Sequence, residues 1–448
     1  MSETARFDPA APLRGRYEAP PDKSISHRAA ILAAMSEGTC HINGYLDAGD
    51  TRSTLSAVQA LGASVKLGLP GPRGEIEVKI GGIGLYGPSR RREPVSIDVG
   101  NAGTLLRILP GWLAGQRSGS FSLDGDESIK ARPVDRIAIP LRKMGARVSI
   151  RDGRLTPLVV EGSPLDGVDH TLPIASAQVK SCLILAALLA RRSTTIVEPG
   201  PSRDHTERMW RAAGAEIRVD KLASMPGRSH DPRRLVVQPA SRLRCPRIDV
   251  SSDFSSAAFF IVAALLVPGS ELRIRRVNLN STRIGLLAIL NRMGARIEVM
   301  EDPLARGEPV GDLIVRASAL TGTLVGAVEV AAAIDELPLL ALLGAFAAGE
   351  TVLCGAKDLR NKESDRIAAA VRVIGGLGGA IEEREDGFVV QGGDGLDGGA
   401  ISAGGDHRIA MLGAIAGVAS RRGVEVEGID TAAISYPNFC DDLARLNA

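Results

Sequence analysis

A sixfold internal repeat constrains this 448-residue chain more than any other feature. Each copy consists of a polar cluster, a helix-length apolar run, a turn of small residues and a short stretch rich in β-forming residues. The copies start near residues 24, 101, 176, 251, 335 and 406, so the period is roughly 70 to 85 residues. Self-similarity at a regular spacing is stronger evidence than any single motif, and it predicts one supersecondary unit used six times.

A Gly-Ala pair recurs in most copies, between an amphipathic stretch and β-forming residues. Glycine directly after a helix is typical of a left-handed stop, and alanine lets helix and sheet approach closely. Each copy therefore predicts two helices and three or four strands, with one helix so apolar that it must be buried. The pairs are Gly62-Ala63, Gly145-Ala146, Gly214-Ala215, Gly294-Ala295 and Gly379-Ala380.

The length of the chain exceeds what one hydrophobic core usually serves, so we expect two domains of three copies each. We assign residues 22–250 to the first domain and residues 1–21 with 251–448 to the second. The stretch Asp220 to Arg247 is rich in proline, arginine and glycine, and predicts a loop or crossover. The residues before Pro20 predict a lone strand, which either half could take and which we assign to the second.

Composition narrows the class of protein. Apolar residues make up 44% and charged residues 24% of the chain, and the formal net charge is +2. These values are ordinary for a soluble globular protein and lack the basic excess of nucleic-acid binders. The apolar runs are too short to span a bilayer, and no signal peptide is evident. We therefore expect a cytoplasmic monomer with no nucleic-acid or membrane partner.

The five cysteines are widely spaced and form no CxxC motif. This pattern favours a reducing compartment over a disulfide framework or a zinc site. The histidines lack metal-ligand spacing, so no metal is expected.

Polar clusters precede all six apolar runs. Each cluster alone is more typical of a helix N-cap than of a ligand site. Six such clusters are harder to explain by capping alone, and helix N-termini facing one cleft would suit an anionic ligand. The clusters contain Lys23, Ser24 and Arg28; Asn101, Gly103 and Thr104, with Arg107 and Arg132 beyond; Ser176 and Gln178; Asp253 and Ser255; Asp335 and Glu336; and Asp406, His407 and Arg408.

The segment Arg360-Asn361-Lys362-Glu363-Ser364-Asp365-Arg366 lies between the fifth and sixth clusters. One interpretation is a solvated charged turn that opens a helix. The other is a carboxylate held among three cations, able to accept or give a proton beside a phosphate. The residues themselves favour neither.

Seven motifs in fixed order resemble the 5-enolpyruvylshikimate-3-phosphate synthase family: PPDKSISHR, GNAGTLLR, IKARP, SAQVK, SRDHTE, NKESDR and DHRIAM. The resemblance runs from about Arg14 to the C-terminus, and RPVDRIAIPLRKMG and SRDHTE are similar to the bacterial branch that includes glyphosate-tolerant enzymes. It implies a two-domain inside-out α/β barrel built from six βαβαββ repeats, three per domain, with the active site in the cleft between domains.

The family transfers the enolpyruvyl group of phosphoenolpyruvate to the 5-hydroxyl of shikimate 3-phosphate and releases phosphate, through a tetrahedral intermediate. The resemblance thus implies a transferase of aromatic amino-acid biosynthesis, a glyphosate target, that acts on small molecules without metal or organic cofactor. Both substrates are phosphorylated carboxylates, which suits a site with helix N-termini and arginines.

Site residues carry over motif by motif. The proton transfers are assigned jointly to Lys23, Asp335 and Glu363, without a step for each. Shikimate 3-phosphate would be held by Lys23, Ser24, Arg28, Ser176, Ala177, Gln178, Arg203, Asp335 and Lys362. Phosphoenolpyruvate would be held by Lys23, Gly103, Arg132, Gln178, Arg366 and Arg408.

Three positions depart from the family pattern. Pro21 replaces a glycine before Asp22, and a fixed φ there could alter hinge geometry. Ile434 replaces a lysine, which implies the loss of one cationic phosphate contact. Asn361 stands where valine is common, and we expect no consequence.

Two alternatives stay open. The sister transferase that acts on UDP-N-acetylglucosamine shares the fold, but it carries a cysteine before its arginine anchor, and Asp124 to Arg132 contains none. A non-catalytic phosphometabolite-binding protein is the other, and the departures at Pro21 and Ile434 are compatible with it. Retention of Lys23, Asp335 and Glu363 argues against that loss of catalysis.

Overall fold

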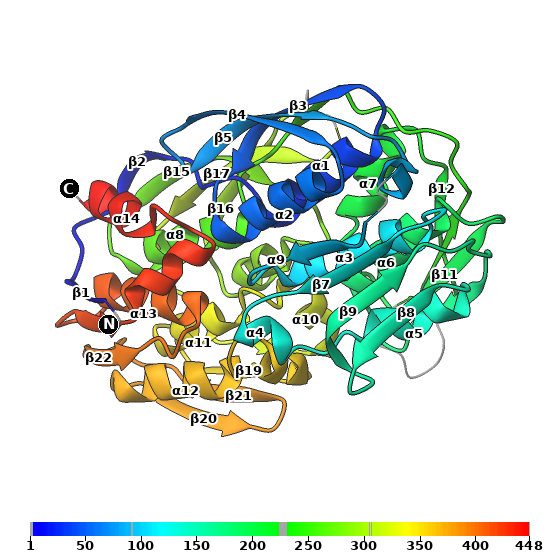
Figure 1. Ribbon diagram of the computed structural model, residues 1–448. Coiled ribbons are helices and arrows are strands. Elements are labelled where there is room, and N and C mark those ends of the chain that lie inside the picture. Colours follow the sequence, from blue (N-terminus) through cyan, green and yellow to red (C-terminus); the bar gives the residue numbers. More distant parts are fainter. Residues whose placement is uncertain (1–2, 91–92, 224–230, 304, 306, 448) are drawn as a thin grey trace. The chain divides into compact units, whose positions relative to one another are not determined.

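The computed structural model of the chain describes residues 3–90, 93–223, 231–303, 305 and 307–447. The chain forms two compact units, shown in Figure 1. Unit 1 comprises Met1–Pro20 and Ser251–Ala448, and unit 2 comprises Pro21–Val250. Both chain ends therefore belong to unit 1. Each unit has its own hydrophobic core.

The described part of unit 2 contains three four-stranded sheets of identical pattern. In each, an edge strand is parallel to its neighbour, and the remaining two strands are antiparallel. The first sheet has the order β14 (Arg247–Asp249), β3 (Thr39–Leu46), β5 (Glu75–Gly81), β4 (Ser64–Pro70). The second is β6 (Val95–Asp98), β7 (Ser120–Asp124), β9 (Leu155–Glu161), β8 (Arg147–Arg151). The third is β10 (Asp169–Thr171), β11 (Thr194–Glu198), β13 (Arg233–Val237), β12 (Ile217–Lys221).

Unit 2 has an inner set of helices, α1 (Lys23–Met35), α3 (Gly103–Ala114) and α6 (Ala177–Ala187), which are almost entirely buried. Helix α3 contacts both α1 and α6. The other helices are α2 (Gly49–Ala60), α4 (Glu127–Lys130), α5 (Asp135–Lys143) and α7 (His205–Ala212), with a 3-10 turn η1 (Gly87–Arg90).

Unit 1 repeats this arrangement with two four-stranded sheets and one three-stranded sheet among its described residues. The first is β2 (Arg14–Tyr17), β15 (Glu271–Asn278), β17 (Val310–Arg316), β16 (Arg296–Glu301). The second is β18 (Leu324–Val325), β19 (Glu350–Leu353), β21 (Gly387–Gln391), β20 (Ala380–Arg384). The third is β1 (Thr4–Phe7), β23 (Val424–Glu427), β22 (Gly399–Ser402), in which β22 is parallel and β1 antiparallel to β23.

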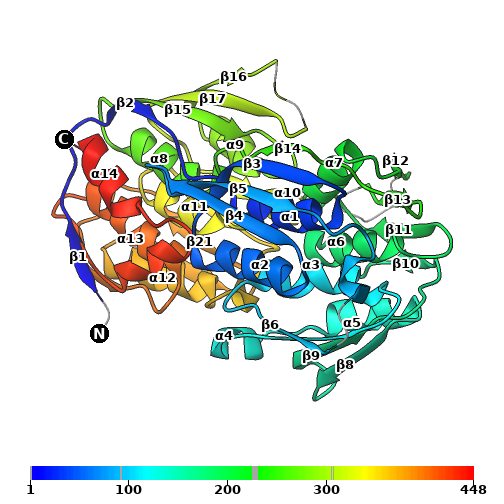
Figure 2. The same cartoon turned by 45° about the horizontal axis from the view of Figure 1, so that its top comes forward.

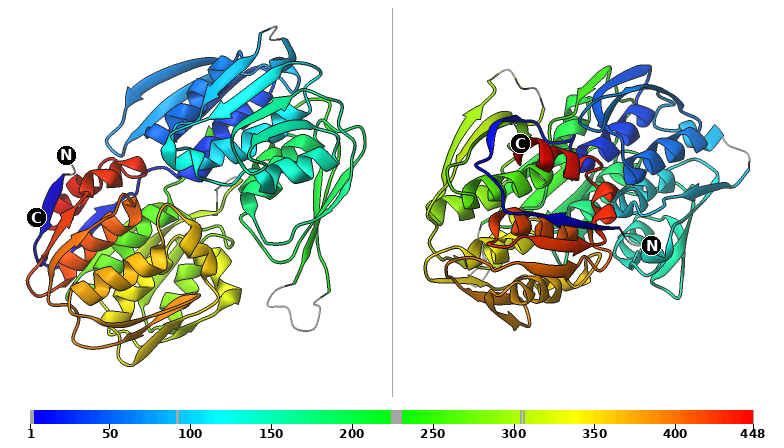
Figure 3. Two further views of the ribbon diagram at one scale, coloured as in Figure 1. Left: turned by 60° about the horizontal axis from the view of Figure 1, so that its bottom comes forward. Right: turned by 90° about the vertical axis from the view of Figure 1, so that its left-hand side faces the viewer.

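The inner helices of unit 1 are α8 (Phe254–Leu266), α11 (Leu337–Ala345) and α13 (His407–Ala419). They contact one another, and Figure 3 shows them with the strands of the unit around them. The remaining elements are α9 (Gly285–Arg292), α10 (Ala327–Ala333), α12 (Arg366–Gly376), α14 (Phe439–Asn447) and the 3-10 turns η2 (Lys357–Asn361) and η3 (Ile429–Ile434). All six predicted apolar helices are thereby confirmed.

The two segments that join the units each carry an edge strand. Strand β2, just before the boundary after Pro20, pairs with β15, although all of unit 2 intervenes in the sequence. Strand β14, just before the boundary after Val250, returns to pair with β3. Figure 2 shows β2 beside β15 and β14 beside β3. One sheet in each unit is therefore completed by a strand more than 200 residues away along the chain.

Two expectations about strands need correction. The stretch Asp220 to Arg247 is not a loop throughout, because β13 lies within it. In β13 the buried Leu235 and Val237 alternate with more exposed residues, as in a strand with one buried face. The two arginines at the start of β13 hide this alternation in the sequence. Residues 224–230 fall outside the described part. The N-terminal segment forms two strands, β1 and β2, instead of one.

The glycine stops agree with the structure at four of the five Gly-Ala pairs. Gly62, Gly145, Gly214 and Gly294 have positive φ, which favours glycine. In the fifth pair the left-handed residue is Gly378, with φ of 92°, and not Gly379. Ala380 is exposed, so it is not buried between helix and sheet.

No helix in the described ranges is long and apolar enough to cross a membrane.

Candidate active site

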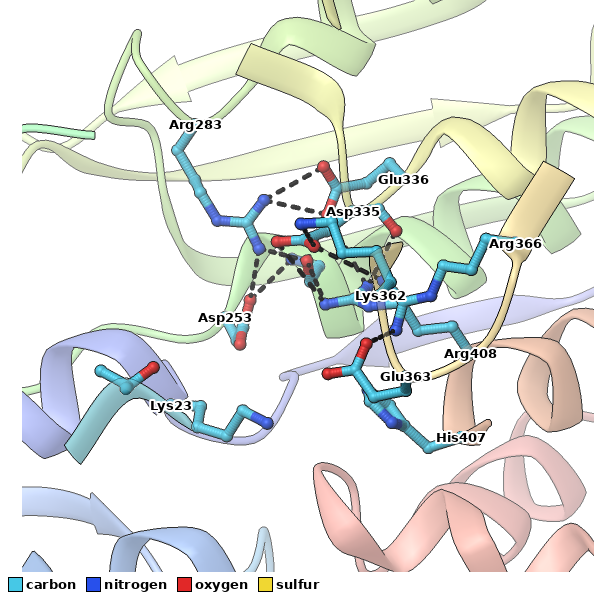
Figure 4. A network of polar contacts seen from close by, with 12 residues as sticks. Lys23, Asp253, Arg283, Asp335, Glu336, Lys362, Glu363, Arg366, His407 and Arg408 are labelled. Atoms are coloured by element: carbon cyan, nitrogen blue, oxygen red, sulfur yellow. Dashed lines mark hydrogen bonds and ion pairs between the residues drawn. The ribbon is translucent and has the colours of Figure 1, made fainter. Parts of the chain in front are cut away.

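The carboxylate of Asp335 lies among three cations in unit 1, just before α11 (Figure 4). Its oxygens are 3.7 to 3.9 Å from nitrogens of Lys362, Arg366 and Arg408. The aspartate side chain is 16% exposed. A partly exposed carboxylate in such a setting can bind a polar ligand and exchange a proton with it.

Arg366, the first residue of α12, is buried and fixed by two carboxylates. Its Nε donates to Asp406 Oδ2 at 2.9 Å, and its Nη2 donates to Glu363 Oε2 at 2.7 Å. Burial opposes the charge on Arg366, but Glu363 and Asp406 outweigh it and raise the pKa of the guanidinium. Burial would raise the pKa of Asp406, yet Arg366 prevails and lowers it. Both groups are therefore ionised at neutral pH.

A second buried network lies beside Arg408. Arg283 Nη1 is 2.9 and 3.0 Å from the two carboxylate oxygens of Glu336, which is completely buried. Ser255 Oγ accepts from Arg283 and donates to Glu336. Arg408 donates to the same Ser255 Oγ at 3.1 Å and to the backbone oxygen of Asp335 at 3.1 Å. The network thus fixes one guanidinium at the edge of the Asp335 site.

The charged segment before α12 fits neither sequence interpretation completely. Asp365 caps α12 through the Ala368 N–H, as a capped turn predicts. Glu363 contacts Arg366, as the proton-transfer hypothesis requires. Arg360 instead pairs with Asp365 and Glu383, and Lys362 approaches Asp335. The expectation of one carboxylate held by all three cations was therefore wrong for Arg360.

In unit 2, Lys23 begins α1, and its Nζ donates to Asp50 Oδ2 at 3.1 Å. Asp50 lies in the first turn of α2 and is nearly buried. The sequence analysis did not identify Asp50, because an aspartate there is typical of a helix start. His27, one turn of helix from Lys23, is buried, which lowers its pKa to about 3.

Arg28 is buried between three helices of unit 2. Its Nε donates to Thr206 Oγ1 at 2.8 Å, and its Nη2 donates to Ser181 Oγ at 3.2 Å. Its Nη1 donates to the backbone oxygen of Ser24 at 3.0 Å, which brings these two predicted residues together. Two of its three anchoring residues, Thr206 and Ser181, were not identified from the sequence.

Five predicted residues of unit 2 lie at or near the start of α3. Arg107 Nη1 lies 3.3 Å from Gln178 Oε1, and Gln178 Nε2 lies 3.3 Å from Thr104 Oγ1. A Cβ placed on Gly103 would lie 3.0 Å from both Arg107 Nη1 and Arg132 Nη1. The glycine therefore leaves room for two guanidinium groups at one helix start.

The remaining predicted residues have simple placements. Ser176 caps α6 by accepting the Val179 N–H, and Ala177 is the first residue of that helix. Arg203 is half-buried in the loop between β11 and α7. Ile434 is the last residue of η3.

Capping also accounts for part of the repeated polar clusters. Asp22, Asp253 and Asp406 cap α1, α8 and α13 through their side chains. Asp253 and Asp406 combine this role with contacts to Arg283 and Arg366, respectively. Asp253 and Asp406 therefore each cap a helix and hold an arginine at the same time.

Lys180 is a buried lysine of α6 that the sequence analysis did not select. Its Nζ lies 3.0 Å from Glu198 Oε1 and 2.8 Å from Glu207 Oε1. It also donates to the backbone oxygen of Ser202 at 3.3 Å. The only signal in the sequence was its place in the SAQVK motif.

No group of three or more possible metal ligands occurs within the described ranges.

Comparison with solved structures first identifies the class. An enolpyruvyl transferase, NikO from Streptomyces tendae, has a similar fold with a TM-score of 0.75 at 17% identity, covering 100% of this chain and 98% of that one. EPSP synthase from Acinetobacter baumannii is more similar, with a TM-score of 0.86 at 36% identity over 100% of this chain and 98% of that one. The chain thus has an enolpyruvyl transferase fold.

The family follows from the sequence comparisons. Residues 7–443 match the family EPSP synthase (3-phosphoshikimate 1-carboxyvinyltransferase). A 3-phosphoshikimate 1-carboxyvinyltransferase from Synechococcus sp. (strain JA-3-3Ab) is 44% identical over 98% of this chain and 96% of its own length. One from Halorhodospira halophila (strain DSM 244 / SL1) is 43% identical over 99% and 96%. The chain belongs to the EPSP synthase family, and the resemblance inferred from its motifs is confirmed.

Proposed function

We propose that this chain catalyses transfer of the enolpyruvyl group of phosphoenolpyruvate to the 5-hydroxyl of shikimate 3-phosphate, with release of phosphate. Family membership supports the reaction. The observation that carries the proposal at the level of residues is the Asp335 carboxylate among Lys362, Arg366 and Arg408. The three cations can bind phosphate and carboxylate oxygens, and the Asp335 carboxylate can accept or donate a proton.

The reaction requires two opposite proton movements at one carbon. The 5-hydroxyl oxygen attacks C2 of phosphoenolpyruvate and loses its proton, while C3 gains one, which gives a tetrahedral intermediate. C3 then loses a proton, the bond between C2 and the phosphate oxygen breaks, and phosphate leaves. We propose that Lys23, Asp335 and Glu363 share these transfers, while arginines compensate the charge of the reacting groups.

The residues that we assign to the two substrates belong to both units of the chain. Unit 2 would supply Lys23 and the anion-binding residues of α1, α3 and α6, and unit 1 would supply Asp335, Glu363 and their cations. Arg28 and Gln178 in unit 2, and Arg366 and Arg408 in unit 1, are each oriented by neighbours within their own unit.

We also propose that the fold is the inside-out α/β barrel of six βαβαββ repeats, three in each unit. The common strand order of five sheets and the burial of six inner helices support it. The sheet of the sixth repeat has three strands, and β22 is parallel to β23. The N-terminal strand β1 pairs with β23 in the place that two antiparallel strands take in the other five sheets.

We further propose a monomer that acts in the cytoplasm. Five free cysteines support a reducing compartment. Light scattering on the purified chain should give a mass near 46.9 kDa, and twice that mass would contradict the monomer.

The decisive assay is phosphate release from phosphoenolpyruvate by the purified chain. We expect release with shikimate 3-phosphate and none with UDP-N-acetylglucosamine. Release with the sugar nucleotide alone would identify the sister activity. Release with neither acceptor would indicate a binding protein.

A matched pair of variants connects the assay to the site. Asp335→Asn should abolish most phosphate release, because the amide cannot accept the proton. Glu385→Gln should not change it, because Glu385 forms only an exposed pair with Lys357 in the same unit.

A further inference from the structure

The buried lysine of α6 has an unusual charge balance. One ammonium faces two carboxylates, and all three side chains are at most 3% exposed. Burial raises the pKa of Glu198, against the opposing effect of Lys180. Burial would lower the pKa of Lys180, but the two glutamates outweigh it and raise the pKa. Replacing a buried ion pair by apolar side chains of similar volume is often neutral or stabilising, so stability alone is a weak explanation for this cluster.

Lys180 connects three separate elements. Glu198 is the last residue of β11, Ser202 lies in the following loop, and Glu207 belongs to α7. Ser202 Oγ also donates to Glu198 Oε2 at 2.7 Å, so the loop is held at both its side chain and its backbone. The cluster therefore fixes the loop that carries Arg203, and the start of α7, against α6.

The neighbours of this cluster are the groups that orient Arg28. Ser181 follows Lys180 on α6, and Thr206 precedes Glu207 on α7. Their hydroxyls lie 2.6 Å apart, and each accepts a hydrogen bond from the Arg28 guanidinium. A shift of α7 relative to α6 would separate these two acceptors.

We infer that Lys180 is a positioning residue for the anion-binding side of the shikimate 3-phosphate site in unit 2. By binding Glu198 and Glu207 together it holds the Thr206–Ser181 acceptor pair that orients Arg28, and it holds the loop of Arg203. Lys180 itself is 1% exposed and bonded to Glu198 and Glu207, so we assign it no direct contact with the ligand. This inference rests on the proposed function, since it assigns shikimate 3-phosphate as the ligand of Arg28 and Arg203.

The test compares Lys180→Met and Glu207→Gln with the wild type. Shikimate 3-phosphate affinity is measured by calorimetric titration, and KM is measured for both substrates. A displaced binding group weakens its ligand by roughly 10- to 100-fold. We expect that loss for shikimate 3-phosphate in both variants, with the KM for phosphoenolpyruvate within about twofold of wild type.

Two controls separate positioning from general destabilisation. Glu207→Gln leaves one carboxylate for one ammonium, so this variant should fold even if Lys180→Met does not. Both tryptophans, Trp112 and Trp210, are buried in unit 2, so their fluorescence reports the unfolding midpoint of that unit. Glu161→Gln removes a glutamate of the same unit that pairs with Arg147 at the surface, and it should change nothing.

Unchanged shikimate 3-phosphate affinity in Glu207→Gln would overturn the inference. A parallel loss of both substrates and of kcat, tracking a lower unfolding midpoint, would also overturn it, because that pattern denotes a structural role. Failure of the proposed function gives a different result, namely wild-type protein without phosphate release. The calorimetric comparison does not depend on turnover, so it still decides the inference wherever the wild type binds the ligand.

Discussion

Arg366 Nε lies 2.9 Å from Asp406 Oδ2, and the same carboxylate caps α13 by accepting the Arg408 N–H at 2.9 Å. One buried aspartate carboxylate therefore orients two arginines of the candidate site. It accepts from the side chain of Arg366 and from the backbone N–H of Arg408. Asp406 is fully buried, and Arg366 is 2% exposed.

Asp406→Asn should destabilise unit 1 strongly. The amide keeps the shape of the side chain but leaves the Arg366 charge with less compensation, and breaking a buried pair typically costs about 3–5 kcal/mol. Urea unfolding followed by circular dichroism measures the loss. Glu385→Gln is the surface control in the same unit, and we expect no measurable change for it. An Asp406→Asn protein as stable as the wild type would show that this pair contributes little.

Glu363→Gln should nearly abolish turnover and leave shikimate 3-phosphate binding within a few-fold. Glutamine can still accept the hydrogen bond from Arg366, so the local structure should persist while the proton-transfer group is lost. General acid–base groups typically contribute about 100- to 10,000-fold to the rate. Steady-state kcat with both substrates saturating is the measurement. Retention of more than about a tenth of the wild-type kcat would refute the role.

Gly103→Ala should weaken inhibition by glyphosate. The family resemblance implies that the inhibitor occupies the phosphoenolpyruvate pocket and that alanine at this position accompanies tolerance. A methyl group at residue 103 would meet Arg107 and Arg132 at 3.0 Å. Overpacking costs about 1–3 kcal/mol, which is roughly 5- to 150-fold in the inhibition constant.

The wild type should accordingly be inhibited competitively with phosphoenolpyruvate, whose KM should change less than the glyphosate constant in Gly103→Ala. Inhibition kinetics on both proteins decide the matter. A tolerant wild type whose constants do not respond to the substitution would contradict the steric argument. Ile434→Lys, which restores the cation expected at that position, would then be the next variant to measure.

Unit 2 should lose stability in mild acid because of His27. Its pKa is about 3 in the folded protein, chiefly because of burial, whereas an unfolded histidine titrates near 6.5. As the pH falls below about 6.5, the unfolded state takes up a proton that the folded state refuses until about pH 3. The stability present above pH 6.5 is therefore lost by about 1.4 kcal/mol per pH unit through this window.

His27→Gln removes this contribution and supplies the comparison. The loss of unfolding free energy between pH 7.5 and pH 5 should be smaller in the variant by about 2 kcal/mol. Tryptophan fluorescence during urea unfolding reports unit 2 alone, since both tryptophans lie there. Equal pH dependence in the two proteins would mean that the His27 ring is protonated in the folded state.

The sequence by itself determined the six inner helices, because long apolar runs bounded by polar caps leave few other structures open. It also determined the family, because seven motifs occur in a fixed order. Residues such as Glu363 and Arg366 were identified because they lie within one of these motifs, NKESDR, and the contact between them is local.

Only the tertiary structure decided how distant charges pair. Asp50 with Lys23, Arg283 with Glu336, and Lys180 with Glu198 and Glu207 join segments whose sequences carry no mark of the partner. The same holds for β2 and β14, each paired with a strand more than 200 residues away along the chain. Packing of helices and sheets sets these distances, and burial gives the resulting ion pairs a strength that isolated residues in water would lack.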